Sequence, residues 1–308
     1  MVVHNFSYGL LNPVLGYAMS CLGAFLGLRC VTRARAYTGF GRARWLILAS
    51  VALGATGIWT MHFIAMLGYT IPGQQITYNV PLTIASMLIA IAVVGVGLFI
   101  VGFGKGGWLP LLTGGVIVGI GVATMHYLGM AAMSMPVSVH YDAGLFIMSV
   151  VIAIVAGTAA LWAGTRVRGI GATIGASLIM GVAVSGMHYT GMAAMRVTPG
   201  PMTAMSGSTA SSFLVPLLLG VSLVTFVLTL TISLSPTEDE INQDAVLQNR
   251  IDTQFPAAFP AAQSTAAQSP GPAQSPGTAQ RPGTAQSPGT ARRSGASGSL
   301  FSKPPRVG

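Results

Sequence analysis

The sequence has very little charge, and almost none of it is negative. Only 7% of the 308 residues are charged, whereas a typical soluble domain has roughly 25%. Before residue 236 the single acidic residue is Asp142, against nine basic residues. No acid–base pair and no activated nucleophile can be assembled from this set, so we do not expect an enzyme.

Cysteine is also scarce, and the two cysteines are poorly placed for joint chemistry. Cys21 and Cys30 lie nine residues apart, which puts them on opposite faces and at different depths of one predicted helix. We therefore predict neither a disulfide nor a cysteine metal site. The basic residues do not form a patch interleaved with aromatic residues, so nucleic acid is not an expected partner.

Long apolar runs dominate the rest of the chain. Hydrophobic residues make up 52% of the sequence, and seven runs reach the roughly 20 residues that a helix needs to cross a bilayer. They lie near residues 10–31, 45–68, 80–103, 109–133, 143–165, 170–195 and 213–235. No charged leader with a cleavage site precedes the first run, so we predict that it is a true span. The predicted fold class is all-α, a polytopic membrane bundle of seven transmembrane helices, with the lipid bilayer as a partner.

The composition changes at about residue 236. Beyond this point the chain is rich in Ala, Gln, Ser, Pro, Gly and Thr, with near-copies of AQSPGT between residues 267 and 291. Such a segment has too little apolar surface to offset the entropy lost on ordering. We predict a membrane domain over 1–235 and a disordered, low-complexity cytoplasmic tail over 236–308, without a recognisable catalytic or output domain.

The short connections between the runs predict the orientation. Basic residues gather in the first, third and fifth connections, whereas the second and fourth contain no Lys or Arg. Arg196, at the end of the sixth run, is the one exception. Because positively charged loops stay in the cytoplasm, we expect the N-terminus outside and the tail inside.

One short motif occurs three times, each time at the predicted outer end of a run. It reads MHFIAM at 61–66, MHYLGMAAM at 125–133 and MHYTGMAAM at 187–195. The neighbouring sequence repeats as well, because Tyr78 and Asn79 fill the place that Tyr141 and Asp142 fill one unit later. We predict a helical hairpin repeated three times, pairing spans one and two, three and four, and five and six, with the seventh alone. Such repeats often place a site where the units meet.

The motif joins imidazoles to thioethers. Residues four and seven apart share a helix face, so each histidine should form a stripe with the methionines that follow it. The stripes are His126, Met130 and Met133 in the second copy, and His188, Met192 and Met195 in the third. In the first copy, Tyr69 stands where the last thioether would be. Thioether sulfur favours Cu(I) and imidazole binds both oxidation states of copper, whereas zinc more often has cysteine or carboxylate ligands. Copper is therefore the predicted cofactor.

The candidate site residues are those of the three motifs and a second group near the same membrane surface. The predicted metal ligands are Met61, His62, Met66, Met125, His126, Met130, Met187, His188 and Met192. The second group is His4, His140, Met133, Met195, Tyr127 and Tyr189. A lone histidine or methionine in a span is usually a packing residue. Three histidines in equivalent places favour a function, because intramembrane ionisable groups are costly.

At these motifs the chain resembles the MHYT domain of bacterial integral-membrane sensors. The resemblance covers roughly residues 4–235 and rests on Met125, His126 and Tyr127 and on Met187, His188 and Tyr189. It implies repeated helix pairs in the bacterial plasma membrane, copper binding, and sensing of oxygen, carbon monoxide or nitric oxide. The first motif departs from the pattern because Phe63 replaces the tyrosine. Many family members continue into diguanylate cyclase, phosphodiesterase or kinase modules, which the low-complexity tail does not resemble.

The sequence thus predicts a copper-dependent membrane sensor that responds to a diatomic gas or to redox state. An unidentified cytoplasmic signalling partner would carry the signal onward. A copper-handling protein for storage, delivery or transport would use the same donors, and Met202 and Met205 favour it mildly. A haem protein with axial His or Met ligands is a further alternative. Whether the three motifs form one site or several is left open by the sequence.

Overall fold

The computed structural model describes residues 7–199, 207–235 and 238–254. Within these ranges, seven helices are long and apolar enough to cross a membrane, which confirms the predicted all-helical fold. Five spans are single helices: α1 (Leu11–Ala36), α4 (Val80–Phe103), α5 (Trp108–Ala131), α6 (Ala143–Arg166) and α7 (Ile170–Ala194). The second span joins α2 (Gly39–Val51), the π-helix η1 (Ala52–Trp59) and α3 (Thr60–Leu67), and the seventh joins η2 (Ala210–Leu214) and α8 (Val215–Leu234).

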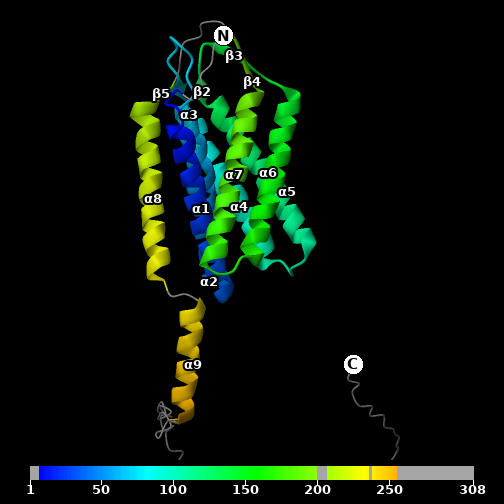
Figure 1. Ribbon diagram of the computed structural model, residues 1–308, viewed down its shortest axis with the longest axis vertical. Helices are drawn as coiled ribbons and strands as arrows, with labels where there is room; N and C mark the ends of the chain where they lie inside the picture. The colour runs from blue at the N-terminus through cyan, green and yellow to red at the C-terminus, as the bar shows by residue number, and fades with distance from the viewer. Residues whose placement is uncertain (1–6, 200–206, 236–237, 255–308) are drawn as a thin grey trace, which may run out of the picture. The chain divides into compact units, whose positions relative to one another are not determined.

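The first six spans form a closed ring. Each packs against the next along the chain, and α7 packs back against α1. The three motif-bearing helices α3, α5 and α7 also contact one another inside the ring. The seventh span lies outside it, against α1 and η1 (Figure 1). The ring thus repeats three times around its axis, and α8 covers only one of the three units.

Glycines let the ring helices approach backbone to backbone. A Cβ on Gly23 of α1 would lie 2.3 Å from the backbone nitrogen of Gly57 in η1. A Cβ on Gly119 of α5 would likewise lie 2.3 Å from the Cα of Ile154 in α6. Both distances are shorter than van der Waals contact, so only glycine permits this packing, as is common between transmembrane helices.

The second span is less regular than one helix. Its middle third is η1, a π-helix of 8 residues that ends immediately before α3. Pi-helical turns are rare and are often found at functional sites. Because η1 has a wider turn than an α-helix, it sets the rotation of α3, and therefore the direction in which the first motif faces.

Polar contacts fix the seventh span to the ring. The hydroxyls of Thr56 in η1 and Thr225 in α8 are 2.8 Å apart and buried. Nearer the other end, Arg33 of α1 donates to the carbonyl oxygens of Ile232 and Ser235, at 2.6 and 2.9 Å. These bonds cap the end of α8, where carbonyl groups have no partner within the helix.

Short strands cover the motif end of the bundle. One sheet has the order β2 (Met133–Ser134), β1 (Thr77–Tyr78), β5 (Ser208–Thr209), and β3 (Val137–Tyr141) pairs with β4 (Met195–Pro199), all antiparallel. The next helices begin with equivalent caps: Asn79 accepts a hydrogen bond from the backbone of Leu82, and Asp142 from that of Leu145. The single acidic residue of the bundle is thus an N-cap.

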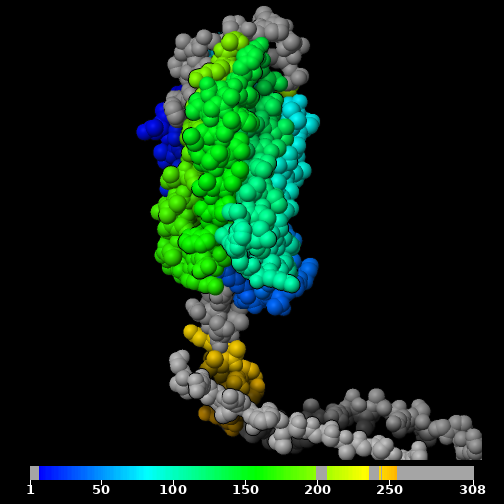
Figure 2. Space-filling model, turned by 90° about the vertical axis from the view of Figure 1, so that its right-hand side faces the viewer, coloured from blue at the N-terminus to red at the C-terminus, as the bar shows by residue number. Residues whose placement is uncertain are grey.

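The outer surface of the bundle is apolar, as a bilayer requires. Figure 2 shows the face formed by α5 and α6. Both helices have exposed hydrophobic residues, such as Ile120 of α5 and Ile147 and Val155 of α6, at 51%, 60% and 62% exposure. The chain is therefore a multi-pass membrane protein.

The segment after the seventh span begins with helix α9 (Glu238–Gln254). This differs from the prediction of disorder from residue 236 onward. The rest of the tail lies outside the described residues, as do His4, Met202 and Met205.

Candidate metal centre

The three motif histidines come from three different helices. His62 lies in α3, His126 in α5 and His188 in α7, each five or six residues before its helix ends. Their side chains are only 1%, 0% and 1% exposed. Because α3, α5 and α7 meet inside the ring, the three imidazoles lie together near one end of the bundle, on its axis.

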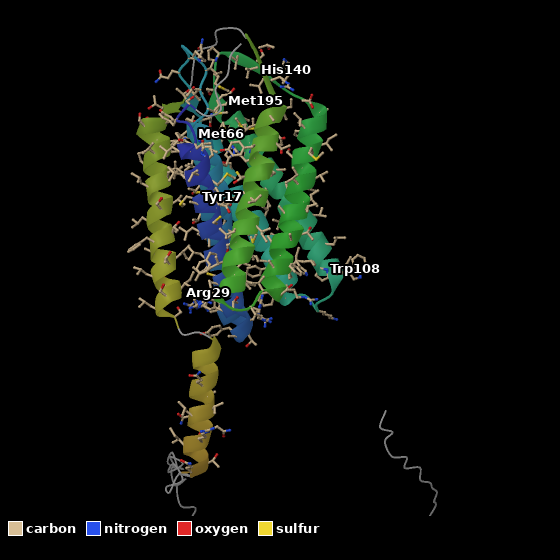
Figure 3. All side chains as sticks on the ribbon, in the orientation of Figure 1. Tyr17, Arg29, Met66, Trp108, His140 and Met195 are labelled. Atoms are coloured by element: carbon tan, nitrogen blue, oxygen red, sulfur yellow. The ribbon has the colours of Figure 1, made fainter. Side chains whose placement is uncertain are left out.

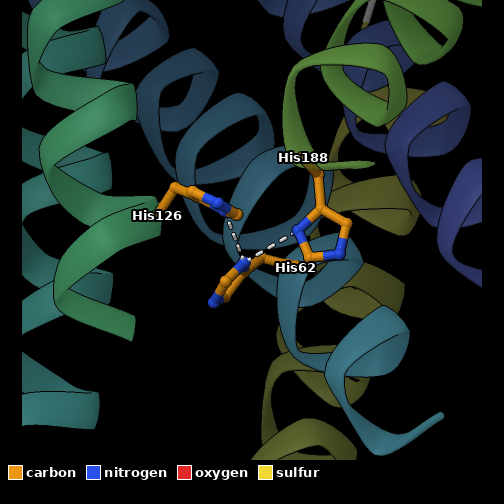
Figure 4. A group of neighbouring side chains, drawn as sticks. All are labelled: His62, His126 and His188. Atoms are coloured by element: carbon orange, nitrogen blue, oxygen red, sulfur yellow. Dashed lines mark hydrogen bonds between the residues drawn. The ribbon is translucent and has the colours of Figure 1, made fainter. Parts of the chain in front are cut away.

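The histidines form one compact triad (Figure 4). The Nδ1 atom of His62 is 3.0 Å from Nδ1 of His188 and 3.1 Å from Nδ1 of His126. The three ring centroids are 4.9 to 5.1 Å apart, and the ring planes are 79° to 89° from one another. Each ring is thus almost perpendicular to the other two, which answers the question of one site or several: there is one triad.

Two glycines that the sequence analysis did not single out hold the imidazoles in place. A Cβ on Gly129 of α5 would lie 2.4 Å from Nε2 of His62, and a Cβ on Gly191 of α7 would lie 2.3 Å from Nε2 of His126. The rings of His62 and His126 therefore each pack on the backbone of the next motif. The signal was present in the sequence, because both glycines stand three residues after a motif histidine, where the first copy has Ala65.

The triad can hold a metal ion. One ring nitrogen from each of the three histidines lies within 4.8 Å of the other two. Metal–imidazole bonds of about 2.0–2.1 Å place ligand nitrogens roughly 3.3–3.6 Å apart, and the two Nδ1 contacts of His62, at 3.0 and 3.1 Å, are slightly shorter than that. A neutral Nδ1 has either one proton or one lone pair in the ring plane, so His62 cannot make a linear hydrogen bond to both neighbours. A cation among the three would accept one lone pair from each.

No carboxylate or thiol joins the triad among the described residues. The Nε2 atoms of His62 and His126 are buried and have no hydrogen-bond partner there. In metal sites, the second nitrogen of a histidine is usually hydrogen-bonded to a carboxylate, a carbonyl or water. Here the rings of His62 and His126 are instead held by packing against glycine. A donor set of neutral imidazoles in apolar surroundings fits a soft or borderline cation and not calcium or magnesium.

The motif methionines are buried around the triad, but not all on the expected stripes. Met61, Met66, Met125, Met130, Met187 and Met192 are all at most 6% exposed. Met66, Met130 and Met192 lie four residues after a histidine and so share its helix face. The stripe prediction is wrong for Met133 and Met195, because α5 ends at Ala131 and α7 at Ala194, and both methionines lie in strands.

The methionines that precede the histidines face elsewhere. The Cγ atom of Met61 would lie 3.4 Å from a Cβ on Gly16 of α1, so Met61 packs against α1. Met187 lines the cavity on the bundle axis that is described below. Met61 thus meets a neighbouring helix rather than lying on the face that carries His62.

The aromatic residue after each histidine packs edge to face against its ring. The centroid distances are 4.8 Å for Phe63 and 4.9 Å for Tyr127 and Tyr189. The hydroxyl of Tyr127 is 2.7 Å from the hydroxyl of Ser149 in α6. The shared feature of the three copies is therefore the ring, and the phenol of Tyr127 bonds away from the triad.

Tyr69 is a buried phenol just beyond the first motif. Its hydroxyl has no hydrogen-bond partner among the described residues. Burial, and secondarily the nearby Tyr141, raises the pKa of Tyr69 to about 12. The side chain is therefore neutral at physiological pH and adds no charge to the buried end of the second span.

His140 does not belong to the triad. It lies in β3, exposed, and pairs with Arg196 of β4 in the strand ladder. Figure 3 shows it at the end of the bundle near Met195, beyond Met66. The pairing of β3 with β4 is enough to explain the position of His140, and no metal ion is needed.

An apolar cavity of about 60 Å³ lies on the axis below the triad. Its lining includes Ile58, Val122 and Val184, each four residues before a motif histidine. Residues four apart share a helix face one turn apart, so these three side chains form the layer directly beneath the imidazoles. The triad thus lies between a thioether-bearing turn on one side and an aliphatic layer on the other.

The fold and the site define a class: a membrane bundle of three repeated units around a shared histidine triad. The sequence matches the MHYT family, described as the bacterial signalling protein N terminal repeat, over residues 56–114, 119–176 and 181–240. These matches cover more than half of the chain, and the protein belongs to this family. Each matched stretch begins six or seven residues before a motif histidine and includes the span that follows.

Curated bacterial proteins share this region. The chain is 35% identical over 206 residues to the bifunctional diguanylate cyclase/cyclic di-GMP phosphodiesterase MucR of Pseudomonas aeruginosa, covering 65% of this chain and 30% of that protein. It is 35% identical over 200 residues to the cyclic di-GMP phosphodiesterase NbdA of the same species, covering 63% and 25%, and 32% identical over 192 residues to the signaling protein YkoW of Bacillus subtilis, covering 58% and 23%.

The chain thus spans less than a third of the length of these relatives. The similarity covers the membrane repeats, and the enzymatic domains of the relatives lie outside the aligned region. The chain is matched as a membrane sensor domain of signalling proteins. No solved structure matches it.

Proposed function

We propose that the protein is a copper-dependent membrane sensor in which His62, His126 and His188 hold one ion. The observation that carries the proposal is the convergence of three buried Nδ1 atoms from three repeats. Copper rather than zinc is supported by the buried thioethers one turn beyond each histidine, because soft sulfur ligands favour Cu(I). When bound, copper would supply a redox-active centre that can also bind a diatomic gas.

The chain's own residues would convert a change at this centre into a change of helix packing. The triad joins α3, α5 and α7, one helix from each repeat, and the imidazoles pack on Gly129 and Gly191 with no free space. A change in the preferred separation of the nitrogens would therefore move whole helices. A ligand shifts such an equilibrium only as far as it binds the two states differently.

The axial cavity supports a small apolar ligand such as oxygen, carbon monoxide or nitric oxide. It begins one turn from the triad and its lining is almost entirely aliphatic. Apolar cavities of this kind stay dry and bind apolar guests. The signal would then pass to a cytoplasmic partner, and the names of MucR and NbdA favour a partner that makes or degrades cyclic di-GMP.

The geometry favours this function over haem binding or copper delivery. The ring centroids of the three imidazoles are about 5 Å apart, and the rings of His62 and His126 pack directly on neighbouring helices. A porphyrin ring does not fit between side chains packed this closely. Copper delivery needs ligands that reach the surface, whereas the triad is at most 1% exposed. A resident ion suits a sensor.

Metal analysis of the purified full-length chain tests the proposal. We expect about one copper per chain after growth with copper, no Soret band, and loss of copper in the double variant His126→Ala plus His188→Ala. Carbon monoxide or nitric oxide should change the optical or electron paramagnetic resonance spectrum of the loaded protein only. Wild-type protein that lacks stoichiometric copper, or a double variant that retains it, would falsify the proposal.

A further inference from the structure

A second cavity lies at the end of the bundle opposite the triad. Its volume is about 180 Å³, and its walls include Leu46, Leu98 and Leu161. Its polar lining is mostly basic: Arg35 from α1, Arg42 from α2 and Arg168 from the connection between α6 and α7. We call this cavity the arginine vestibule. The first hairpin and the connection before the last ring helix, which are far apart in the sequence, thus bring guanidinium groups to one hollow.

The positive charge of the vestibule meets no carboxylate from residues 7–235. Residues 7–235 contain one carboxylate, that of Asp142, which caps α6 at the motif end. The Nη1 atom of Arg35 is buried and has no hydrogen-bond partner among the described residues. Buried charge is costly unless it is paired, so the vestibule is complementary to an anion.

Arg42 is held against the wall by its own contacts. Its Nε donates to the carbonyl oxygen of Tyr37 at 3.0 Å, and its Nη1 to that of Gly102 at 3.1 Å. Its guanidinium also lies over the ring of Phe103, 5.7 Å from the centroid. These contacts fix one of the three cations in position before any ligand arrives, which lowers the entropic cost of binding.

We propose that the arginine vestibule binds a phosphate group, carried by the headgroup of an anionic phospholipid. The planar fork of a guanidinium matches phosphate oxygens in pairs. The positive-inside rule predicts that this basic end faces the cytoplasm, where anionic headgroups are concentrated and where basic pockets between spans bind them. The leucine walls suit the apolar part of a lipid.

The bound phosphate would join the two ends of the ring. Arg35 and Arg42 belong to the first hairpin, whereas Arg168 precedes α7, the last ring helix. The vestibule also shares Val31 and Gly164 with the cavity below the triad. The site therefore lies on the same axis as the triad, and it is distinct from the proposed copper function.

Lipid binding to the full-length chain tests this proposal. Protein in zwitterionic detergent micelles would be titrated with phosphatidylglycerol or phosphatidylcholine and followed by native mass spectrometry and thermal melting. The variants are Arg35→Gln and Arg168→Gln, and their matched controls are Arg44→Gln and Arg166→Gln, neighbouring arginines that do not line the vestibule. Arg42 is left intact because its backbone bonds hold the wall together.

We expect phosphatidylglycerol to bind preferentially and to raise the melting temperature. Each vestibule variant should weaken phosphatidylglycerol binding by about tenfold, the effect of losing one charge-assisted hydrogen bond, and each control by less than about twofold. Arg168 lies in an exposed connection, so its substitution reports on binding even if Arg35→Gln unfolds the chain. Copper content should be unchanged in all four variants.

Three outcomes would overturn the assignment. Equal binding of phosphatidylglycerol and phosphatidylcholine would exclude recognition of an anionic headgroup. Equal losses in the controls and in the vestibule variants would reduce the effect to general surface charge. Displacement of the lipid by millimolar inorganic phosphate or pyrophosphate would assign the phosphate site to a soluble ligand instead.

Discussion

The first and third motif helices carry the same chemistry in different surroundings. In the most apolar stretch of the second span, 78% of the residues are buried, whereas in that of α7 only 22% of the residues are buried. The second span packs against α1, α4 and α5 and is covered in addition by α8, which contacts η1. The histidines themselves are equally buried, at 1% exposure each, so the triad is insulated from this asymmetry.

The first copy also departs from the others in sequence and in helix type. It has Phe63 for tyrosine and Ala65 for glycine, and η1 precedes it. Nevertheless His62 makes both of the short Nδ1 contacts. A motif that is weaker by sequence therefore supplies the central member of the triad, and the pattern of letters does not rank the ligands.

The largest expected effect is loss of metal on removal of any one histidine. His62→Ala should weaken copper binding as much as His126→Ala, by at least about 100-fold, because even changes behind a ligand cost 10–100-fold. Metal content and competition with a copper chelator measure this. His140→Ala, outside the triad, should keep full metal content. A His62 variant that retained copper while the His126 variant lost it would contradict this prediction and make the first copy dispensable for the metal.

The motif glycines should come next. Gly129→Ala and Gly191→Ala place a methyl group within 2.4 Å of an imidazole nitrogen, so we expect a loss of about 1–3 kcal/mol in stability and about 10–100-fold in copper affinity. Gly186→Ala, where no atom lies within 4 Å of the new Cβ, is the matched control in α7. Thermal melting and chelator competition would show whether the effect is confined to the two motif positions.

Removing the contact between the seventh span and the first copy should have a smaller effect. Thr225→Val leaves the buried hydroxyl of Thr56 without its partner, at a cost of about 1–3 kcal/mol. Thr231→Val is the control, because Thr231 is exposed and bonds only within α8. Melting temperatures of the two variants should differ, and copper content should stay at the wild-type level. Equal melting temperatures would mean that α8 does not depend on this bond.

The smallest effect is expected at the tyrosine that the first copy lacks. Tyr127→Phe removes the hydrogen bond to Ser149 and should cost about 0.5–1.5 kcal/mol without loss of copper, since Phe63 occupies the same place in the first copy. Metal content and melting temperature again provide the measurement. A large loss of copper would show that the phenol acts on the metal, and would separate the second copy from the first.

The sequence predicted the larger features because they depend on local composition. Apolar runs about as long as a bilayer is thick must form spanning helices, and all seven were found near their predicted bounds. The π-helix η1 was not predicted, because the apolar run over 52–59 reads as ordinary helix. The stripes failed at Met133 and Met195, since the sequence does not show that strand pairing replaces the last helical turn.

By itself the sequence determined the spans, the three motifs and the kinds of donor atom they offer, because these follow from residue type and spacing along one helix. Only the tertiary structure decided that the motifs share one triad. Helix rotation depends on contacts between segments more than 60 residues apart, such as His62 against Gly129 and His126 against Gly191. Spacing along a chain does not fix that rotation, whereas close packing of six helices in a ring does.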